Sequence, residues 1–206
     1  MGGVQHSKLM DSSAVSGLSF LEEGQFSKVY KGYMTTSKVP VSIKVPKVPD
    51  FLRKDKKEVK NHIEEAKKLL NSQIRKAQGE NIVRCLNVAY DDFRKEIWVV
   101  REYVDGTDLE TVMKNPSLCP SLLSPEEKMR VAVGIAKGMS YLHGLRYPVV
   151  HGDFKPSDIL LTAKTKVPRL TNFGLWDFKK YFVEETLPAD VVFLNIHQAP
   201  EVIFPK

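Results

Sequence analysis

Short runs in which apolar and polar residues alternate dominate the first half of the chain. Alternation with a period of two is the pattern of a half-buried strand, and clusters of Gly, Pro, Asp and Lys typical of turns separate the runs. The runs cover residues 18–21, 29–34, 39–45, 85–90 and 97–103. We therefore expect an antiparallel sheet of five strands.

The apolar period lengthens between the third and fourth of these runs. Asp55 is followed three residues later by Glu58, which resembles a helix capping signal. The apolar residues that follow recur at helical spacing and are Val59, Ile63, Ala66, Leu70 and Ile74. One helix is therefore expected to interrupt the sheet.

A second helical pattern begins at Ser124, whose side chain can cap a helix. Pro125 suits the first turn, and Glu127 can reach back to the cap. An apolar stripe follows and includes Met129, Val133, Ala136 and Met139. The pattern predicts a helix that runs to His143.

The composition of the chain changes along its length. Residues 1–16 are polar and small, and we expect them to form a flexible leader. Residues 105–124 are rich in Asp, Gly, Asn, Pro and Ser, which predicts a linker and a boundary near Val104. The expected organisation is α+β, with a sheet-rich unit over residues 17–104 and a helical unit over residues 105–206.

The overall composition is that of an ordinary soluble protein, with 42% hydrophobic and 27% charged residues among 206. No apolar run approaches the length that spans a bilayer, and the first residues lack a secretory signal. Cys85 and Cys119 form no metal-like pair and indicate a reducing compartment. We therefore expect a cytoplasmic protein without a transmembrane segment.

The net charge of +6 comes largely from lysines and arginines in and just before the first predicted helix. Glu58, Glu64 and Glu65 interleave with them, and no aromatic or base-reading pattern accompanies the cluster. A solvated helix face explains this cluster better than a nucleic-acid partner does, so no nucleic acid is expected.

Five short motifs carry candidate chemistry. The first, LEEGQFSKVYKG, contains Gly24, Phe26, Val29 and Gly32, and twelve residues later VSIK ends at Lys44. The other three, in chain order, are HGDFKPSDILL, TNFGLW and APE. Phosphoryl transfer needs a loop over the phosphates, a lysine on them, metal ligands, and a carboxylate near the attacking hydroxyl. The motifs offer a candidate for each part.

In this order the five motifs resemble those of the protein kinase superfamily. The resemblance covers residues 18–204. The sequences of the loop and of FKPSDILL are most similar to those of tyrosine-kinase-like serine/threonine kinases, including receptor-interacting-type kinases. It implies a bilobal fold with a five-stranded antiparallel N-lobe, one helix in that lobe, and a helical C-lobe. The chain ends at Lys206, five residues after Glu201, so the C-lobe is expected to be incomplete.

The resemblance implies a use for ATP and Mg²⁺ and assigns the catalytic loop. Asp153 would orient the substrate hydroxyl and accept its proton, and Lys155 would contact the phosphates. Asp158 and Asn172 stand at the two metal-binding positions.

The resemblance also assigns residues to nucleotide binding. Lys44 would contact the phosphates and pair with Glu65 on the following helix, with Glu64 as the fallback for that glutamate. The remaining nucleotide-binding positions that it implies are Gly24, Val29, Glu102, Val104 and Leu160.

Several positions depart from the family pattern. Glu22 and Ser27 replace the first and third glycines of the loop, so a carboxylate beside the triphosphate should weaken nucleotide binding. Asp158 and Asn172 reverse the family's asparagine and aspartate, and two outcomes are open: loss of the metal, or a partial rescue by Asp158. Gly152 replaces the arginine that pairs with a phosphorylated loop, so control by such phosphorylation is not expected.

Arg101 stands where the family has the residue at the back of the adenine pocket, just before the presumed hinge. A charge at this position is unusual and could compete with Lys44 for Glu65. Alternatively the alignment is displaced by one residue, and Arg101 points to solvent.

Three functions fit these features. The leading hypothesis is an ATP-binding pseudokinase that works as a signalling scaffold or allosteric partner. The second is a serine/threonine kinase of low activity that transfers the γ-phosphate of ATP to protein hydroxyls, and the third is an inactive truncated isoform. Because the helix that starts at Ser124 would lack its usual cover, we also expect an exposed apolar patch and a protein partner over it.

Overall fold

The computed structural model describes residues 9–24, 27–47, 57, 60, 61, 64, 68, 77–120 and 124–175. These residues fall into two compact units. The N-terminal unit comprises the described residues up to 68 together with 84–103, and the C-terminal unit comprises residues 77–83 and 104–175.

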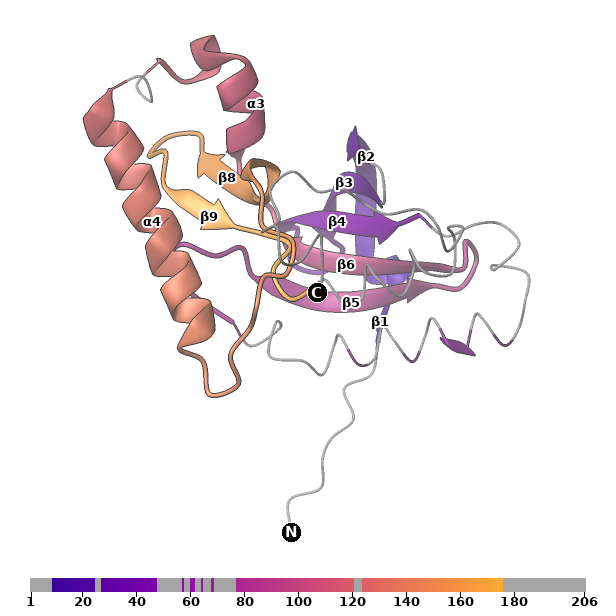
Figure 1. Cartoon of the computed structure of the whole chain (residues 1–206). Helices are drawn as coiled ribbons and strands as arrows, with labels where there is room; N and C mark the ends of the chain where they lie inside the picture. The colour runs from indigo at the N-terminus through magenta and orange to yellow at the C-terminus, as the bar shows by residue number, and fades with distance from the viewer. Residues whose placement is uncertain are drawn as a thin grey trace, which may run out of the picture. The chain divides into compact units, whose positions relative to one another are not determined.

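A six-stranded sheet forms most of the N-terminal unit, with the strand order β1-β5-β6-β4-β3-β2 (Figure 1). The strands are β1 (Met10–Asp11), β2 (Val15–Glu23), β3 (Ser27–Met34), β4 (Pro40–Pro46), β5 (Cys85–Asp91) and β6 (Glu96–Glu102). Neighbouring strands are antiparallel, except that β1 runs parallel to β5. The expected antiparallel strands are present, and β1 makes the sheet mixed.

β1 and the 3₁₀ helix η1 (Ser12–Ala14) lie in the segment that the sequence pattern assigns to a flexible leader. Met10 packs against the hydrophobic core, and the backbone N–H of Thr35 donates to the carbonyl of Ala14 at 2.8 Å. The sheet therefore has six strands rather than the expected five. A strand of two residues is too short to produce an alternating pattern, which is why the sequence does not reveal it.

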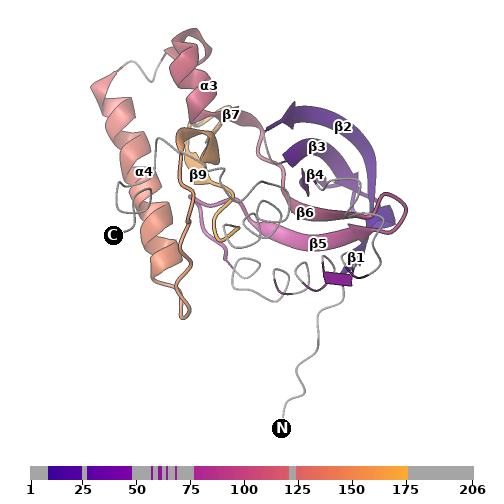
Figure 2. The ribbon, with the colours of Figure 1, turned by 45° about the vertical axis from the view of Figure 1, so that its right-hand side comes forward.

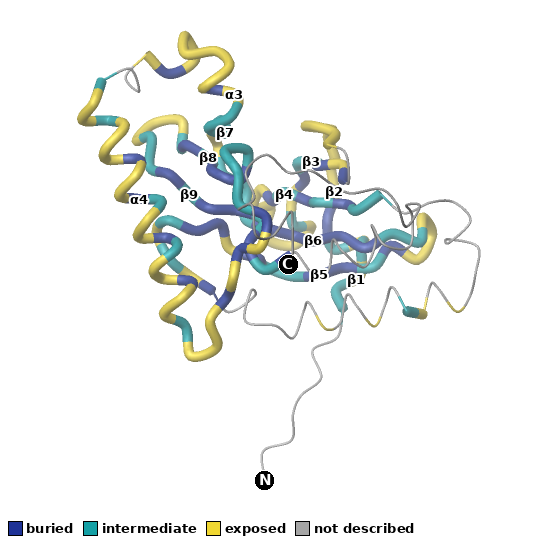
Figure 3. Tube along the Cα trace, viewed as in Figure 1, coloured by how far each residue is buried: buried dark blue, intermediate teal, exposed yellow. Residues whose placement is uncertain are grey.

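The residues of the central strand β4 alternate between the two faces of this sheet. Val41, Ile43 and Val45 are buried in the hydrophobic core, whose strongly buried residues are dark in Figure 3. The other buried members of this core are Val15, Ala89, Trp98 and Val100. Because successive strand residues point to opposite faces, Ser42 and Lys44 lie on the face away from this core.

The first predicted helix is described at five positions. The backbone is helical at residues 57, 60, 61, 64 and 68, and all of these side chains are exposed except the half-buried Asn61. Their spacing of three and four residues places them on one side of the helix. This is the solvated charged face that the sequence predicts. The apolar positions of this helix lie outside the described residues.

The C-terminal unit combines a small sheet with helices (Figure 2). Its strands pair in the order β7-β8-β9 and are antiparallel. In chain order the elements are β7 (Gly106–Asp108), α3 (Leu109–Lys114), η3 (Pro116–Leu118), α4 (Pro125–His143), η5 (Pro156–Asp158), β8 (Ile159–Thr162) and β9 (Pro168–Leu170). Residues 77–83 join this unit through a parallel bridge between Ile82 and Leu170.

Helix α4 starts as the sequence predicts. The Ser124 hydroxyl accepts a hydrogen bond from the backbone N–H of Glu127 at 3.2 Å, and Pro125 occupies the first turn. At its other end the N–H of Gly144 donates to the carbonyl of Ser140. None of the helices among the described residues has the length and apolar character needed to cross a membrane.

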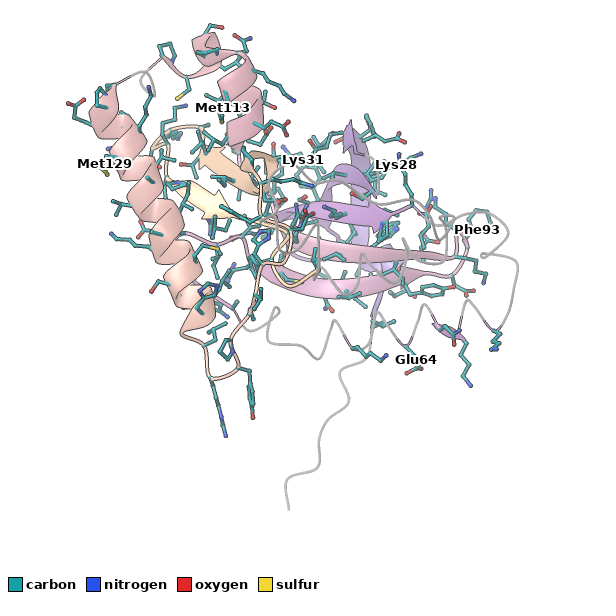
Figure 4. The ribbon with its side chains drawn as sticks, in the orientation of Figure 1. Lys28, Lys31, Glu64, Phe93, Met113 and Met129 are labelled. Atoms are coloured by element: carbon teal, nitrogen blue, oxygen red, sulfur yellow. The ribbon has the colours of Figure 1, made fainter. Side chains whose placement is uncertain are left out.

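The face by which α4 packs is marked by glycine. A Cβ at Gly134 would lie 2.4 Å from Pro168 Cγ, and one at Gly138 would lie 2.8 Å from Leu170 Cδ1. Helix and strand β9 therefore approach closely at these two positions. The expected apolar stripe is not on this packed face. Met129, labelled in Figure 4, is 65% exposed, and Val133 is 45% exposed. An exposed apolar patch is thus present on the described surface of α4.

Candidate active site

The catalytic-loop motif is fixed to the strand that follows it by backbone hydrogen bonds. The N–H of Asp158 donates to the carbonyl of Lys155, and the N–H of Thr171 donates to the carbonyl of Asp158, both at 2.9 Å. The buried His151 ring donates from Nε2 to the carbonyl of Thr171 at 2.9 Å. These bonds hold the loop and the residues after β9 in one place, as a site for positioned chemistry requires.

Asp153 and Lys155 form the first pair of the site. Asp153 is buried, and its Oδ2 accepts a hydrogen bond from Lys155 Nζ at 3.3 Å. Lys155 is half-buried. A carboxylate in this position can accept a proton from a hydroxyl that is brought to it.

Asp158 and Asn172 form the second pair. Asn172 Nδ2 donates to Asp158 Oδ1 at 2.5 Å, so these two motif positions meet in the fold. Asp158 is only 1% exposed, and its Oδ2 has no hydrogen-bond partner within the described part of the chain. A buried carboxylate oxygen of this kind is costly unless it is paired. The pair therefore fits a divalent cation, which prefers oxygen ligands.

Two backbone conformations shape this site. Asn172 has a φ of 63°, a left-handed conformation that Asn tolerates better than most residues. Gly152 has a φ of 80°, which favours glycine at the position where the family has arginine. Gly152 thus allows the backbone to turn just before Asp153, and its position carries no positive charge.

Helix α3 supports the loop from the side. Asp108 caps the helix by accepting from the N–H of Thr111 at 2.8 Å. The hydrogen bond from Lys114 is the main reason that the pKa of Glu110 lies below its ordinary value, and Ser157 and Lys155 act in the same direction. Through Glu110, helix α3 is thus connected to Ser157 of η5 and to Lys155.

Two nucleotide-binding candidates of the N-terminal unit, Val29 and Lys44, lie on the sheet face away from the core. Lys44 is half-buried, with the buried Val29 opposite it on β3 and Val99 opposite it on β6. The N–H of Gly24 donates to the carbonyl of Ser27 at 2.9 Å at the turn between β2 and β3. The register thus brings Val29 and Lys44 together, as the motifs predict.

Two acidic residues, Glu22 and Glu23, end strand β2 just before this turn. Glu22 is exposed and lies opposite Val29 in the register. Glu23 pairs with Lys47 at 2.6 Å and with Lys28 at 3.9 Å, and the Lys47 hydrogen bond lowers the pKa of the Glu23 carboxyl. Lysines therefore offset the charge of Glu23.

Arg101 does not point to solvent. It is 8% exposed, lies opposite Ser42 in the register, and donates from Nη2 to Ser42 Oγ at 3.2 Å. The expectation that Arg101 points to solvent is therefore wrong. The sequence gives no sign of the Ser42 contact, because only the register of β4 against β6 sets these two side chains opposite each other.

The presumed hinge residues make their own contacts. The Glu102 carboxylate accepts from the backbone N–H of Arg84 at 2.8 Å, and the N–H of Glu102 donates to the Arg84 carbonyl at 3.1 Å. Tyr103 lies under the Lys31 ammonium, 4.1 Å from the ring centroid. Val104, the first residue of this part of the C-terminal unit, is half-buried.

The structure describes the remaining predicted site residues only in part. Glu64, the fallback partner of Lys44, is exposed on its helix (Figure 4). Glu65, Phe26 and the APE motif lie outside the described residues. Leu160 is half-buried on β8, opposite Asp108 and Arg169.

The sequence of this chain is similar to one protein family and to individual known proteins. The protein kinase domain family matches residues 17–206. The rust resistance kinase Lr10 of Triticum aestivum is 30% identical over 158 residues, which is 74% of this chain and 22% of that protein. The probable serine/threonine-protein kinase PBL28 of Arabidopsis thaliana is 28% identical over 168 residues, which is 80% of this chain and 41% of that protein.

The chain spans less than half the length of these relatives. The family match nevertheless covers most of the chain, and it agrees with the sheet, the helix α4 and the loop between α4 and β8. The chain belongs to the protein kinase family.

Proposed function

We propose that this chain is a kinase-like domain that binds ATP and works as a signalling scaffold or allosteric partner, with little phosphoryl transfer. The observation that carries the proposal is the hydrogen bond from Asn172 Nδ2 to Asp158 Oδ1 at 2.5 Å. An amide N–H thus occupies one oxygen of the carboxylate at the metal position. The exchange of the two residues does not change the charge of the pair, but it moves the carboxylate to the other metal position.

The remaining residues of the site support nucleotide binding better than they support transfer. Lys44 is half-buried on the sheet face away from the core, next to the apolar Val29, and would contact phosphate oxygens. Asp158 and Asn172 would hold Mg²⁺, which neutralises phosphate charge when it is bound. Because Asp158 already accepts from Asn172, we expect the metal to be held weakly and away from its usual place.

Misplacement of this kind is costly for the rate. An error of about 1 Å in a reacting group costs on the order of a hundredfold. Glu22 adds a second obstacle, since this exposed carboxylate on β2 is separated from Lys44 on β4 only by strand β3 and repels a triphosphate. Both effects leave binding possible but slow the chemical step.

A serine/threonine kinase of low activity is the second candidate, and one observation favours it. Asp153 is buried with its Oδ2 at 3.3 Å from Lys155 Nζ, so the group that accepts the hydroxyl proton remains in place. The relatives PBL28 and Lr10 are named as kinases. In this case Asp153 would take the proton of a protein hydroxyl while Lys155 and Lys44 contact the phosphates.

Thermal unfolding with ATP, with and without Mg²⁺, tests the proposal, because a ligand that binds the folded state must stabilise it. We expect ATP to raise the melting temperature of the wild type and not that of the Lys44→Ala variant. Lys95→Ala is the matched control, since Lys95 pairs with Asp92 at the turn between β5 and β6 and its removal leaves Lys44 intact. A cooperative transition that ATP does not move would refute nucleotide binding.

A further inference from the structure

Helix α4 carries a row of exposed residues on the side opposite its packed face. The buried residues of this helix are Val131, Gly134, Gly138 and Leu142. Because successive residues of an α-helix turn by roughly 100°, a second row lies on the opposite side. This outer row consists of six exposed residues, which are Glu126, Met129, Val133, Ala136, Ser140 and His143. All six positions are therefore accessible to a partner.

The outer row has the spacing of a surface by which helices pair. Its residues recur at intervals of three, four, three, four and three, which is the heptad spacing of two α-helices packed along one another. The row is also symmetric about its own midpoint. In an antiparallel pair of identical helices, Met129 therefore lies opposite Ser140 of the second copy, and Val133 lies opposite Ala136 of the second copy.

The two halves of the outer row differ in shape. Met129 and Val133 form the first half with large apolar side chains that are 65% and 45% exposed. The second half is hollowed, and an open hollow of about 540 Å³ is lined by Val133, Ala136, Lys137, Ser140 and Tyr141. In the antiparallel pair, the large side chains of each copy enter the hollow over the small side chains of the other. Packing of large against small residues is how facing helices fill the space between them.

The ends and one flank of the row carry polar groups. Glu126 in the first turn of α4 lies opposite His143 of the second copy in its last turn. A carboxylate accepts hydrogen bonds and an imidazole carries an N–H donor, so each end of the pair can close with one hydrogen bond. On the flank, Arg130 comes near Lys137 of the second copy, and the salt bridge between Glu127 and Arg130 offsets part of this repulsion.

We propose that the outer row of α4 is a homodimer interface, in which two copies of this chain pair their α4 helices antiparallel about a two-fold axis. The proposal is independent of nucleotide binding, because neither the Lys44 face nor the catalytic loop takes part. A pair of 19-residue helices, about 28 Å long, is small beside the roughly 1,600 Å² of a standard interface. We therefore expect a weak dimer, with a Kd on the order of 100 µM.

Sedimentation equilibrium of the full chain, from about 1 to about 500 µM protein, tests this proposal. We expect the wild type to pass from monomer to dimer over this range. Met129→Lys puts a charge into the hollow of the second copy and should weaken association at least about tenfold. Met113→Lys is the matched control, because Met113 is 63% exposed on α3, outside the outer row (Figure 4). This control should leave the Kd of the dimer unchanged.

Lys137→Glu tests the pairing in the opposite direction, because it turns the repulsion with Arg130 of the second copy into an attraction. This variant should associate about two- to fivefold more tightly, and the gain should shrink in high salt. All three substituted positions are exposed, and Met, Lys and Glu have similar helix propensities, so the variants should fold. Thermal unfolding checks that they do.

Three results would overturn the proposal. One is a wild type that stays monomeric at the highest concentration, which would leave the outer row to a different protein. Another is a dimer that folded Met129→Lys weakens no more than Met113→Lys does. The third is a folded Lys137→Glu variant that associates no more tightly than the wild type, since antiparallel pairing of α4 requires the gain.

Discussion

Replacement of Asn172 by Asp puts a second carboxylate against Asp158. In the wild type, Asn172 Nδ2 and Asp158 Oδ1 are 2.5 Å apart, and Asp158 is 1% exposed. Two carboxylates that relax to roughly 4 Å repel by about 4 kcal/mol at an effective dielectric constant of about 20. Protonation of one carboxyl at neutral pH limits the loss to about the same value, since three pH units correspond to roughly 4 kcal/mol.

The expected result for Asn172→Asp without metal is therefore a loss of up to about 4 kcal/mol in the free energy of unfolding. For a domain of this size that corresponds to a melting temperature lower by roughly 10 °C. In the folded variant the pair retains a proton that the unfolded chain releases above about pH 4, so stability falls as the pH rises. The deficit should shrink as the buffer approaches about pH 5 and when Mg²⁺ is added.

Differential scanning fluorimetry in EDTA and in Mg²⁺, over a series of pH values, measures this effect. Asn115→Asp is the matched control, because Asn115 is exposed and already accepts a hydrogen bond from Ser117. Its melting temperature should not depend on Mg²⁺. An Asn172→Asp protein with the same stability as wild type in EDTA, or one that Mg²⁺ does not stabilise, would refute the proximity of the two motif positions.

Three further predictions follow from the C-terminal unit. Gly138→Ala should destabilise by about 1–3 kcal/mol in urea unfolding, because its Cβ would lie 2.8 Å from Leu170, whereas Gly79→Ala, with its nearest contact at 3.4 Å, should cost much less. Ser124→Ala should lower the stability by about 1 kcal/mol through loss of the α4 cap, and an unchanged urea midpoint would contradict the capping contact. Asp153→Asn should reduce any residual phosphoryl transfer at least about a hundredfold, and undiminished transfer would exclude Asp153 as the proton acceptor.

The strands could be predicted because their residues alternate. Val41, Ile43 and Val45 face the core, and the polar residues between them identify Lys44 as a residue on the other face. β1 could not be predicted in this way, since Met10 and Asp11 form a strand only by pairing with β5. Long-range pairing decides such short elements, and a local pattern does not contain it.

Some features of the candidate site could likewise be predicted from the sequence, and others could not. Motif spacing identifies Asp153, Asp158 and Asn172, and the fold brings the last two into hydrogen-bond contact. Spacing alone left two interpretations of Arg101. The choice between them depends on the register of β6 against β4, which places Arg101 opposite Ser42. Side-chain partners across strands are set by register, so they become known only with the structure.

The packing face of α4 shows why the helix itself was easier to predict than its contacts. Its start is encoded locally, by Ser124 and Pro125. Its contact with β9 depends on Gly134 and Gly138, which have no side chain and give no apolar signal. A repeat of glycine four residues apart is the sequence sign of such a close approach, and the stripe of Met129 and Val133 obscures it.

The central claim is that the chain holds ATP but transfers its γ-phosphate slowly. A single-turnover experiment, with this chain and a serine- and threonine-rich acceptor protein in excess over γ-labelled ATP and Mg²⁺, measures transfer of the γ-phosphate from bound nucleotide to the hydroxyls of the acceptor. Active kinases turn over at about 1–100 per second. The account predicts bound ATP that remains intact at least about a hundredfold longer than such rates allow. Complete conversion of bound ATP within a few seconds would contradict it.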